Sequence, residues 1–160
     1  MIVTAGLLAY YVFTDSFVLD RQGIERTKKY ARSILGASDQ WGIPASTIAA
    51  IICVESSGNP TAQGAIGERG LMQITKGTFE EYRKWAPGFE INPFFGFVDL
   101  WDPVANIYAG TGILKMKLEQ HKDFDRAIRA YNGNPENVLT AYYFFKVSRY
   151  DEVFKTMLNT

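Results

Sequence analysis

One carboxylate in the sequence stands where a carboxylate is costly. Glu55 follows Ile48, Ile51 and Ile52 at helical spacing, so a helix through this segment would place Glu55 on an apolar stripe. Such a carboxylate is expensive unless it is paired or functional, and partial burial would raise its pKa towards neutrality. A carboxyl group that is still protonated near neutral pH can act as a general acid, as carboxylic acids do in glycoside cleavage. Two other interpretations stay open: Glu55 turns to solvent at the helix end, or it pairs with a cation such as Arg69.

The segment after Glu55 has the composition of a loop that can fold back over a helix end. Residues 55–60 read Glu-Ser-Ser-Gly-Asn-Pro, which turns the chain out of a helix, and residues 64–70 contain three glycines. Glycine allows positive φ angles and a close approach of the backbone. Gln73 would add a neutral donor and acceptor to this loop without a competing charge.

Three motifs together resemble the soluble lytic transglycosylase (SLT) domain family. They are E-S-S-G-N-P at 55–60, G-A-x-G-x-x-G-L-M-Q at 64–73 and A-Y-N-x-N at 130–134. The glutamate followed by G-L-M-Q at this spacing is the specific part of the signal. The resemblance extends over residues 24–155, and it implies a lysozyme-like helical fold and the cleavage of peptidoglycan.

The resemblance implies that Glu55 is the single catalytic acid and base. It would protonate the leaving oxygen of the β-1,4 bond between N-acetylmuramic acid and N-acetylglucosamine. It would then take the proton from the C6 hydroxyl of the muramic acid, which closes a 1,6-anhydro ring. The substrate's own acetamido group, rather than a protein nucleophile, would assist the reaction. No metal and no organic cofactor are implied.

Further residues match the family's motifs and are candidates for substrate binding. They are Gln73, Met72, Tyr131, Asn132 and Tyr143. By resemblance, Gln73 is the groove glutamine, Tyr131 and Asn132 line the cleft beneath the reacting sugars, and Tyr143 lies near the catalytic glutamate. Three alternatives stay open: Met72 packs in the core, Asn132 caps a helix, or the neighbouring Tyr142 takes the place assigned to Tyr143.

Two positions depart from the family's pattern. Gly64 stands where many members have a serine that is thought to hydrogen-bond near the catalytic carboxylate, and Ser56 or a backbone N–H would have to replace it. Leu139 stands where some members carry a glutamate four residues before the cleft tyrosine. Neither departure removes the acid Glu55, but both bear on the rate and on the substrate preference.

Two other functions are alternatives. Goose-type lysozymes share the fold, the glutamate and the G-L-M-Q signature, but they hydrolyse with water that aspartates position. One of these aspartates is expected two residues after the motif glutamine, where this chain has Thr75, and Glu68 is the only acidic residue near. This difference favours transglycosylation. The other alternative is a weakly active glycan-binding module of an envelope machine or phage particle, which the departures at Gly64 and Leu139 favour and Glu55 disfavours.

The elements that must position these residues are predicted to be helices. The helices are expected at 22–35, ending at Gly36; from Pro44 to Gly58; from a capping box at 78–81 to the residues before Pro87; behind Asp102-Pro103; at 124–132; and, as one or two helices, in 137–158. A small irregular β element is expected near 63–74, and a long aromatic loop at 87–101 would stack on sugars or close the core. Gly110 and Gly112 lie inside a predicted helix, which indicates close packing there. The fold class is therefore all-α and lysozyme-like: a single compact helical domain with a substrate cleft.

Composition narrows the function classes. The 160 residues include 17 Lys+Arg and 17 Asp+Glu, and this neutral balance argues against a nucleic-acid partner. One cysteine, Cys53, and one histidine, His121, exclude a disulfide framework and a multi-histidine metal site. We expect a monomer that binds peptidoglycan glycan strands through aromatic contacts and hydrogen bonds, with only a weak dependence on salt.

The first residues form an apolar leader at 1–20, ahead of the predicted transglycosylase domain at 21–160. Residues 1–14 carry no charged side chain, but they are too few to span a bilayer as a helix. Three interpretations stay open: a weak signal or membrane anchor, an apolar helix docked on the domain, and the start of an expressed fragment. The expected location is the cell envelope, in the periplasm or outside the cell, or a phage particle, with envelope-machine or phage proteins as partners.

Overall fold

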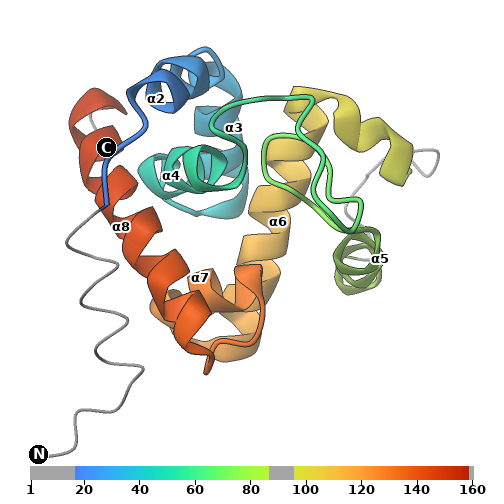
Figure 1. The fold of residues 1–160 in the computed structure, drawn as a ribbon. Helices are drawn as coiled ribbons and strands as arrows, with labels where there is room; N and C mark the ends of the chain where they lie inside the picture. Colours follow the sequence, from blue (N-terminus) through green and yellow to red (C-terminus); the bar gives the residue numbers. More distant parts are fainter. Residues whose placement is uncertain (1–16, 87–95, 159–160) are drawn as a thin grey trace, which may run out of the picture.

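The computed structural model describes residues 17–86 and 96–158. The regular secondary structure of these residues is helical, and a loop joins the helices at residues 57–75 (Figure 1). The helices are α2 (Arg21–Lys28), α3 (Ala31–Trp41), α4 (Ala45–Ser56), α5 (Lys76–Trp85), the 3₁₀ helix η1 (Phe97–Trp101), α6 (Pro103–His121), α7 (Phe124–Asn132) and α8 (Val138–Leu158). They share one hydrophobic core, so the prediction of a compact helical domain is confirmed.

The centre of the core is α4. Every residue from Ala45 to Cys53 is buried, and α2, α3 and α8 pack against this helix (Figure 1). A helix that is apolar on all sides is a core helix rather than an amphipathic surface helix. The stripe expected from Ile48, Ile51 and Ile52 is therefore only part of a fully buried surface, which ends at Cys53, two residues before Glu55.

Helices α4 and α8 run antiparallel along their shared interface. Thr47 near the start of α4 donates a hydrogen bond to Asp151 of α8, and Glu55 near the end of α4 accepts one from Tyr143. The two contacts are eight residues apart on each helix, or about 12 Å along the axes at 1.5 Å per residue. The segment 137–158, expected as one or two helices, forms the single helix α8.

Two glycines inside α6 permit the close packing that the sequence predicts. A Cβ atom on Gly112 would lie 2.7 Å from Tyr82 and 2.8 Å from Trp41, and one on Gly110 would collide with the side chain of Met72. The absence of side chains at these positions therefore brings α5 and the 64–74 loop against α6. Asp102 caps α6 by accepting a hydrogen bond from the Ala105 N–H (2.8 Å), with Pro103 in the first turn as predicted.

Two predicted helix boundaries are wrong. The first predicted helix is broken at Lys29 and Tyr30 instead of ending at Gly36, which lies inside α3 and makes room for the Tyr108 hydroxyl. The second error concerns α5, whose N-cap is Thr75 rather than Thr78. The Thr75 side chain accepts from the Thr78 N–H at 3.1 Å, so Thr78 takes part in a different cap. Glu81, the other residue of the expected motif, pairs with Lys117 instead (3.1 Å).

The β element near 63–74 consists of two isolated antiparallel bridges, Gln63 with Arg69 and Arg69 with Ile74. This agrees with the small irregular element predicted there. The bridges close the loop that follows α4 and bring residue 73 back towards residue 64.

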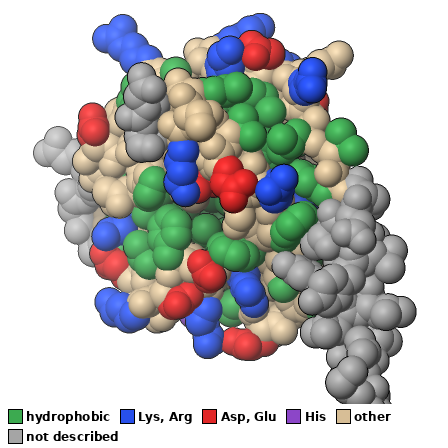
Figure 2. Space-filling view, turned by 90° about the vertical axis from the view of Figure 1, so that its left-hand side faces the viewer, with side chains coloured by type: hydrophobic (Ala, Val, Ile, Leu, Met, Phe, Trp, Pro, Cys, Tyr) green, Lys and Arg blue, Asp and Glu red, His purple; other side chains and the backbone are tan. Residues whose placement is uncertain are grey.

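Two of the predicted segments lie largely outside the described residues. Residues 1–16 of the leader and 87–95 of the aromatic loop are among them, so their roles remain predictions. In the part of the chain that the structure describes, no helix combines the length and the apolarity needed to cross a bilayer. Figure 2 shows the face on the α8 side, where apolar patches alternate with side chains of both charges.

Candidate active site

Glu55 lies in the last turn of α4, where the buried part of the helix gives way to a loop. The helix ends at Ser56, and Ser57 follows in the left-handed conformation with φ 51°. The Ser56 hydroxyl is within hydrogen-bond distance of two carbonyl oxygens, Ile52 O in its own helix (3.1 Å) and Leu71 O in the returning loop (2.8 Å). Ser56 therefore fastens the loop of residues 64–73, called the glycine loop below, to the helix that carries the Glu55 carboxyl group.

The Glu55 carboxyl group is half-buried and has one direct partner. The Tyr143 hydroxyl of α8 donates a hydrogen bond to Glu55 Oε1 at 2.7 Å. Burial raises the pKa of Glu55 to about 7, and the nearby charge of Glu68 adds to the rise, while the Tyr143 hydrogen bond and the charge of Lys146 oppose it. At neutral pH the group is therefore poised between the protonated and the ionised form, as a residue that both gives and takes a proton must be.

Arg69 is not the partner of Glu55. Its guanidinium lies 4.0 Å from the ring centre of Phe97 and 5.4 Å from that of Trp101, and it donates to the Phe97 carbonyl oxygen at 2.9 Å. Phe97 and Trp101 are thus the part of the predicted aromatic loop that closes over Arg69. The alternative in which Arg69 neutralises Glu55 is wrong.

Tyr131 and Tyr143 lie close to Glu55 from two different helices. The Tyr131 hydroxyl at the end of α7 donates to the Met72 carbonyl oxygen at 2.9 Å. Burial, and then the charge of Glu55, raises the pKa of both tyrosines well above the usual value, so both hydroxyls stay protonated donors. The structure therefore joins α4, α7, α8 and the glycine loop around one carboxyl group.

Gln73 is held by the loop in which it stands. Its side-chain nitrogen donates to Ala62 O at 3.0 Å and to Gly70 O at 2.8 Å, and its backbone adopts a positive φ of 45°. These bonds use both donors of the amide, and its Oε1 atom points towards Gly64. Gln73 is consequently a rigid part of the loop with its carbonyl oxygen presented beside the 64–68 turn.

Met72 and Asn132 are placed differently from the other candidates. The Met72 side chain is fully buried against Gly110, so the structure favours the packing alternative for this side chain. Asn132 is exposed in the last position of α7, one residue after Tyr131. No hydrogen bond in the described part of the chain connects it to Glu55.

Asn106 is a structural residue that the sequence reasoning missed. It is completely buried in the first turns of α6, where its side chain accepts from Met72 N (2.8 Å) and donates to Arg69 O (2.8 Å) and Leu100 O (2.9 Å). Buried amides are retained when all their hydrogen bonds are made. The signal in the sequence is a polar residue on the buried side of a glycine-containing helix, but its partners are set by the tertiary structure.

The described residues offer no metal site: no three His, Cys, Asp or Glu side chains among them lie close enough together to hold an ion. Cys53 is buried beside the Thr27 hydroxyl at 3.2 Å, and burial raises the pKa of its thiol to about 11. It is therefore an inert thiol at neutral pH.

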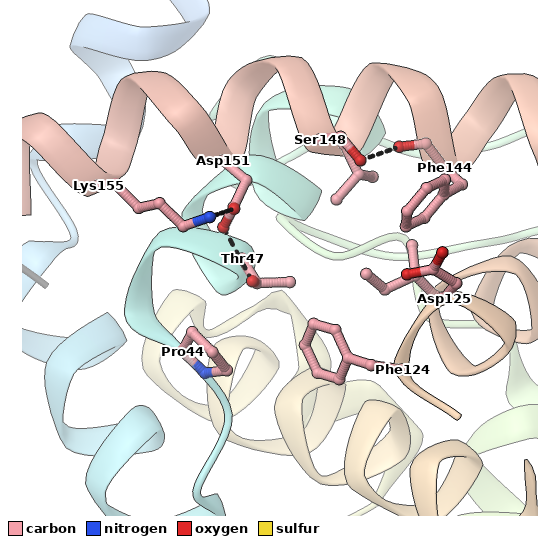
Figure 3. Close-up of a pocket in the computed structure, with 10 residues that line it drawn as sticks. Pro44, Thr47, Phe124, Asp125, Phe144, Ser148, Asp151 and Lys155 are labelled. Carbon is pink, nitrogen blue, oxygen red and sulfur yellow. Dashed lines mark hydrogen bonds and ion pairs between the residues drawn. The ribbon is translucent and has the colours of Figure 1, made fainter. Parts of the chain in front are cut away.

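A separate pocket lies at the opposite end of the α4–α8 interface (Figure 3). It has a volume of about 220 Å³ and is lined by the starts of α4 and α7 and by α8. Asp151 stands at one side of this pocket, where it accepts from the Thr47 hydroxyl (2.9 Å) and pairs with Lys155 (2.6 Å). This second carboxylate is thus fully engaged by a hydroxyl and a cation.

Comparison with known proteins assigns the chain to a family. The profile of the "Transglycosylase SLT domain" family matches residues 32–146. The transglycosylase of Enterobacteria phage PRD1 is 31% identical over 63% of this chain and 33% of its own length. The membrane-bound lytic murein transglycosylase C of Shigella sonnei is 33% identical over 86% of this chain and 40% of its own length. The chain thus spans between a third and two fifths of these relatives.

Solved structures agree with this assignment. The 70-kDa soluble lytic transglycosylase of Escherichia coli matches 81% of this chain and 24% of its own with a TM-score of 0.71 and 26% identity. An inactive mutant of the lytic transglycosylase Slt from Pseudomonas aeruginosa has the same fold, with a TM-score of 0.75 over 94% of this chain and 28% of its own at 23% identity. The helical fold, with the Glu55 carboxyl group at the loop that follows α4, places the chain in the lysozyme-like class. Within that class, the chain belongs to the SLT transglycosylase family.

Proposed function

We propose that this chain is a peptidoglycan lytic transglycosylase with Glu55 as its only acid and base. The observation that carries the proposal is the half-buried Glu55 carboxyl group, hydrogen-bonded by Tyr143 and with a pKa of about 7. The names of relatives support the substrate class, because the Shigella sonnei relative is a lytic murein transglycosylase and the phage PRD1 relative is a transglycosylase.

In the proposed reaction, protonated Glu55 gives its proton to the oxygen between N-acetylmuramic acid and N-acetylglucosamine. The C1–O bond breaks, and the substrate's acetamido group stabilises the positive charge that develops at C1. The C6 hydroxyl of the same muramic acid then bonds to C1, and ionised Glu55 takes the hydroxyl proton. Glu55 is thereby protonated again, as it was at the start, and no water is consumed.

The remaining site residues have supporting roles in this proposal. Tyr143 holds the Glu55 carboxyl group in one orientation, and Tyr131 fixes the loop through the Met72 carbonyl oxygen. Gln73 offers its carbonyl oxygen to a hydroxyl or amide of the sugar. Asn132, exposed one residue after Tyr131, would contact the glycan, and Met72 would act through its packing and its carbonyl group.

A hydrolytic reaction of the goose-lysozyme type is less well supported. It would need a carboxylate to hold the attacking water, and the position two residues after Gln73 is Thr75. The Thr75 hydroxyl is occupied as the N-cap of α5 and by the Thr78 hydroxyl at 2.9 Å. We therefore propose cleavage without water, in the cell envelope or as part of a phage particle.

Product mass tests the proposal directly. Purified protein is incubated with isolated cell walls, and the released muropeptides are weighed by mass spectrometry. The proposal expects 1,6-anhydro products, which are lighter by one water than hydrolytic products, and their loss in E55Q. Hydrolytic products would identify the lysozyme-type reaction. Wall binding that is equal in the wild type and E55Q, without release from either, would identify a glycan-binding module instead.

A further inference from the structure

The turn at residues 64–68 holds a second carboxylate, that of Glu68, beside Gln73 in the loop that Ser56 fastens to the end of α4. Gly64 N donates to Glu68 O at 3.0 Å, and Gly67 N donates to Gly64 O at 3.2 Å, which closes a tight turn. The Glu68 side chain folds back into this turn, and its Oε2 atom accepts from the Ile66 N–H at 3.0 Å. The Glu68 carboxylate is therefore held over Gly64.

Gly64 leaves space for the Glu68 carboxylate and does not serve a left-handed backbone conformation. Its φ is not positive, in contrast to Gly67 in the same turn with φ 88°. A Cβ atom on Gly64 would collide with Glu68 Oε2 and would lie 3.0 Å from Gln73 Oε1, whereas nothing lies within 4 Å of a Cβ on Gly67. The Glu68 carboxylate thus occupies the volume that any side chain at position 64 would need.

We propose that Glu68 is a positioning residue of the transglycosylase site, whose carboxylate takes the place of a side chain at position 64 and whose charge acts on the acid Glu55. An effect of Glu68 on the reaction, as distinct from its effect on the Glu55 carboxyl group, rests on the proposed function. The Glu68 carboxylate also explains the departure at Gly64, because a serine there and this position of Glu68 exclude one another.

Among the described residues, four titratable groups interact with Glu55 from the elements packed against it. Tyr143 and Lys146 belong to α8, Tyr131 to α7 and Glu68 to the loop. The tyrosines stay neutral, so the two charges are of opposite sign: Lys146 favours ionised Glu55, and Glu68 disfavours it. Glu68 consequently helps to keep Glu55 protonated where Lys146 would promote proton loss.

The substitution E68Q separates the charge from the turn. Glutamine retains a carbonyl oxygen that can accept from the Ile66 N–H, so the turn is kept while the negative charge is removed. Ionised Glu55 then becomes less unfavourable, its pKa falls, and its protonated form is lost at lower pH. We therefore expect the alkaline limb of the pH–activity profile to move to lower pH.

Two variants serve as matched comparisons. K146Q removes the opposing charge, so its alkaline limb should move to higher pH. E152Q makes the same chemical change as E68Q on the exposed side of α8, where Glu152 pairs with Arg149 at 3.2 Å, and should leave the limb unchanged. G64A should shift the limb in the direction of E68Q by displacing the carboxylate, but should add nothing in an E68A background.

The experiment measures two quantities for each variant: the pH profile of kcat/KM on cell walls, and the pKa of the Glu55 carboxyl carbon from NMR titration. The inference expects both to fall in E68Q, with a thermal midpoint close to that of the wild type. It is overturned if the Glu55 pKa is the same in E68Q and the wild type, or if E68Q changes the ratio of anhydro to hydrolytic products, which would make Glu68 a water-positioning residue. If the wild type releases no anhydro product, the proposed function is overturned. If the Glu55 pKa is nevertheless lower in E68Q than in the wild type, the effect of Glu68 on Glu55 still stands.

Discussion

Two carboxylates occupy opposite ends of the α4–α8 interface, and each accepts a hydrogen bond from a hydroxyl on the facing helix. Glu55 accepts from Tyr143 at 2.7 Å, and Asp151 accepts from Thr47 at 2.9 Å. The difference lies in the second partner. Asp151 has Lys155 at 2.6 Å, whereas Glu55 has no cation within ion-pair distance among the described residues and lies near the negative charge of Glu68.

This difference separates a carboxylate that holds a fold together from one that can do chemistry. The Asp151 carboxylate links two helices and a lysine, because it accepts from the Thr47 hydroxyl and pairs with the Lys155 ammonium group. A carboxyl group with burial as its dominant influence instead keeps its proton up to a higher pH. The same helix pair therefore supports both kinds of group: Asp151 is paired with a cation, and burial dominates at Glu55.

The largest expected difference between the two carboxylates appears when the charge of each is removed in turn. E55Q should lose at least about 10³-fold in kcat/KM, because a neutral amide cannot exchange the proton. D151N should retain activity within about threefold and lose about 1 kcal/mol of unfolding free energy, since it weakens an ion pair and a hydrogen bond. Release of anhydro-muropeptides and urea unfolding measure the two effects. A large loss of activity in D151N would show that the two ends are not functionally distinct.

The difference between Glu55 and Asp151 is predictable from the sequence only where it depends on residues that are close together in the chain. Glu55 is identifiable because its position in an apolar run and its distance from G-L-M-Q are local features. The pairing with Tyr143 bridges 88 positions, and sequence alone left the neighbouring Tyr142 as an alternative. The three hydrogen bonds of Asn106 depend on how a loop returns to a helix, which no local pattern encodes.

Glycines illustrate the same limit. The sequence correctly predicts that Gly110 and Gly112 mark close packing, because a glycine inside a helix has few other causes. It incorrectly ends a helix at Gly36, since a glycine at a potential helix end and one that makes room for a tyrosine look identical. The compensation between Gly64 and Glu68 is invisible until the turn that joins them is known.

Stability against pH should distinguish Glu55 by the sign of its effect. Its pKa in the folded protein, about 7, lies above the ordinary value of 4.5, so folding favours the protonated form. The resulting stabilisation is complete below pH 4.5 and is lost as the pH rises through 7. E55Q stays neutral, so its unfolding free energy relative to wild type should improve by about 2 kcal/mol between pH 4.5 and pH 8, after allowance for partial exposure. Urea unfolding at both pH values measures this, and an equal difference at the two values would contradict it.

Removing the Tyr143 hydroxyl should affect activity less than replacing Glu55 itself. Y143F removes the hydrogen bond that favours ionised Glu55, so the Glu55 pKa should rise and the alkaline limb should move to higher pH. The carboxyl group also loses its fixed orientation, for which we expect a roughly tenfold loss of kcat at the optimum. Y142F is the matched control on the adjacent residue and should leave the limb in place. A fall of the limb in Y143F would mean that Tyr143 acts in some other way.

The smallest expected effect belongs to the opposite end of the interface. T47V replaces the buried Thr47 hydroxyl with a methyl group of similar size and leaves Asp151 with Lys155 as its partner. Because the carboxylate remains paired and borders the pocket rather than the core, the loss of unfolding free energy should be about 0.5 to 1 kcal/mol. The pH profile of activity should be unchanged, since Thr47 is separated from Glu55 by about two turns of α4. A shifted profile in T47V would mean that the Asp151 end communicates with Glu55 through the helix pair, and that the two carboxylates form one coupled system.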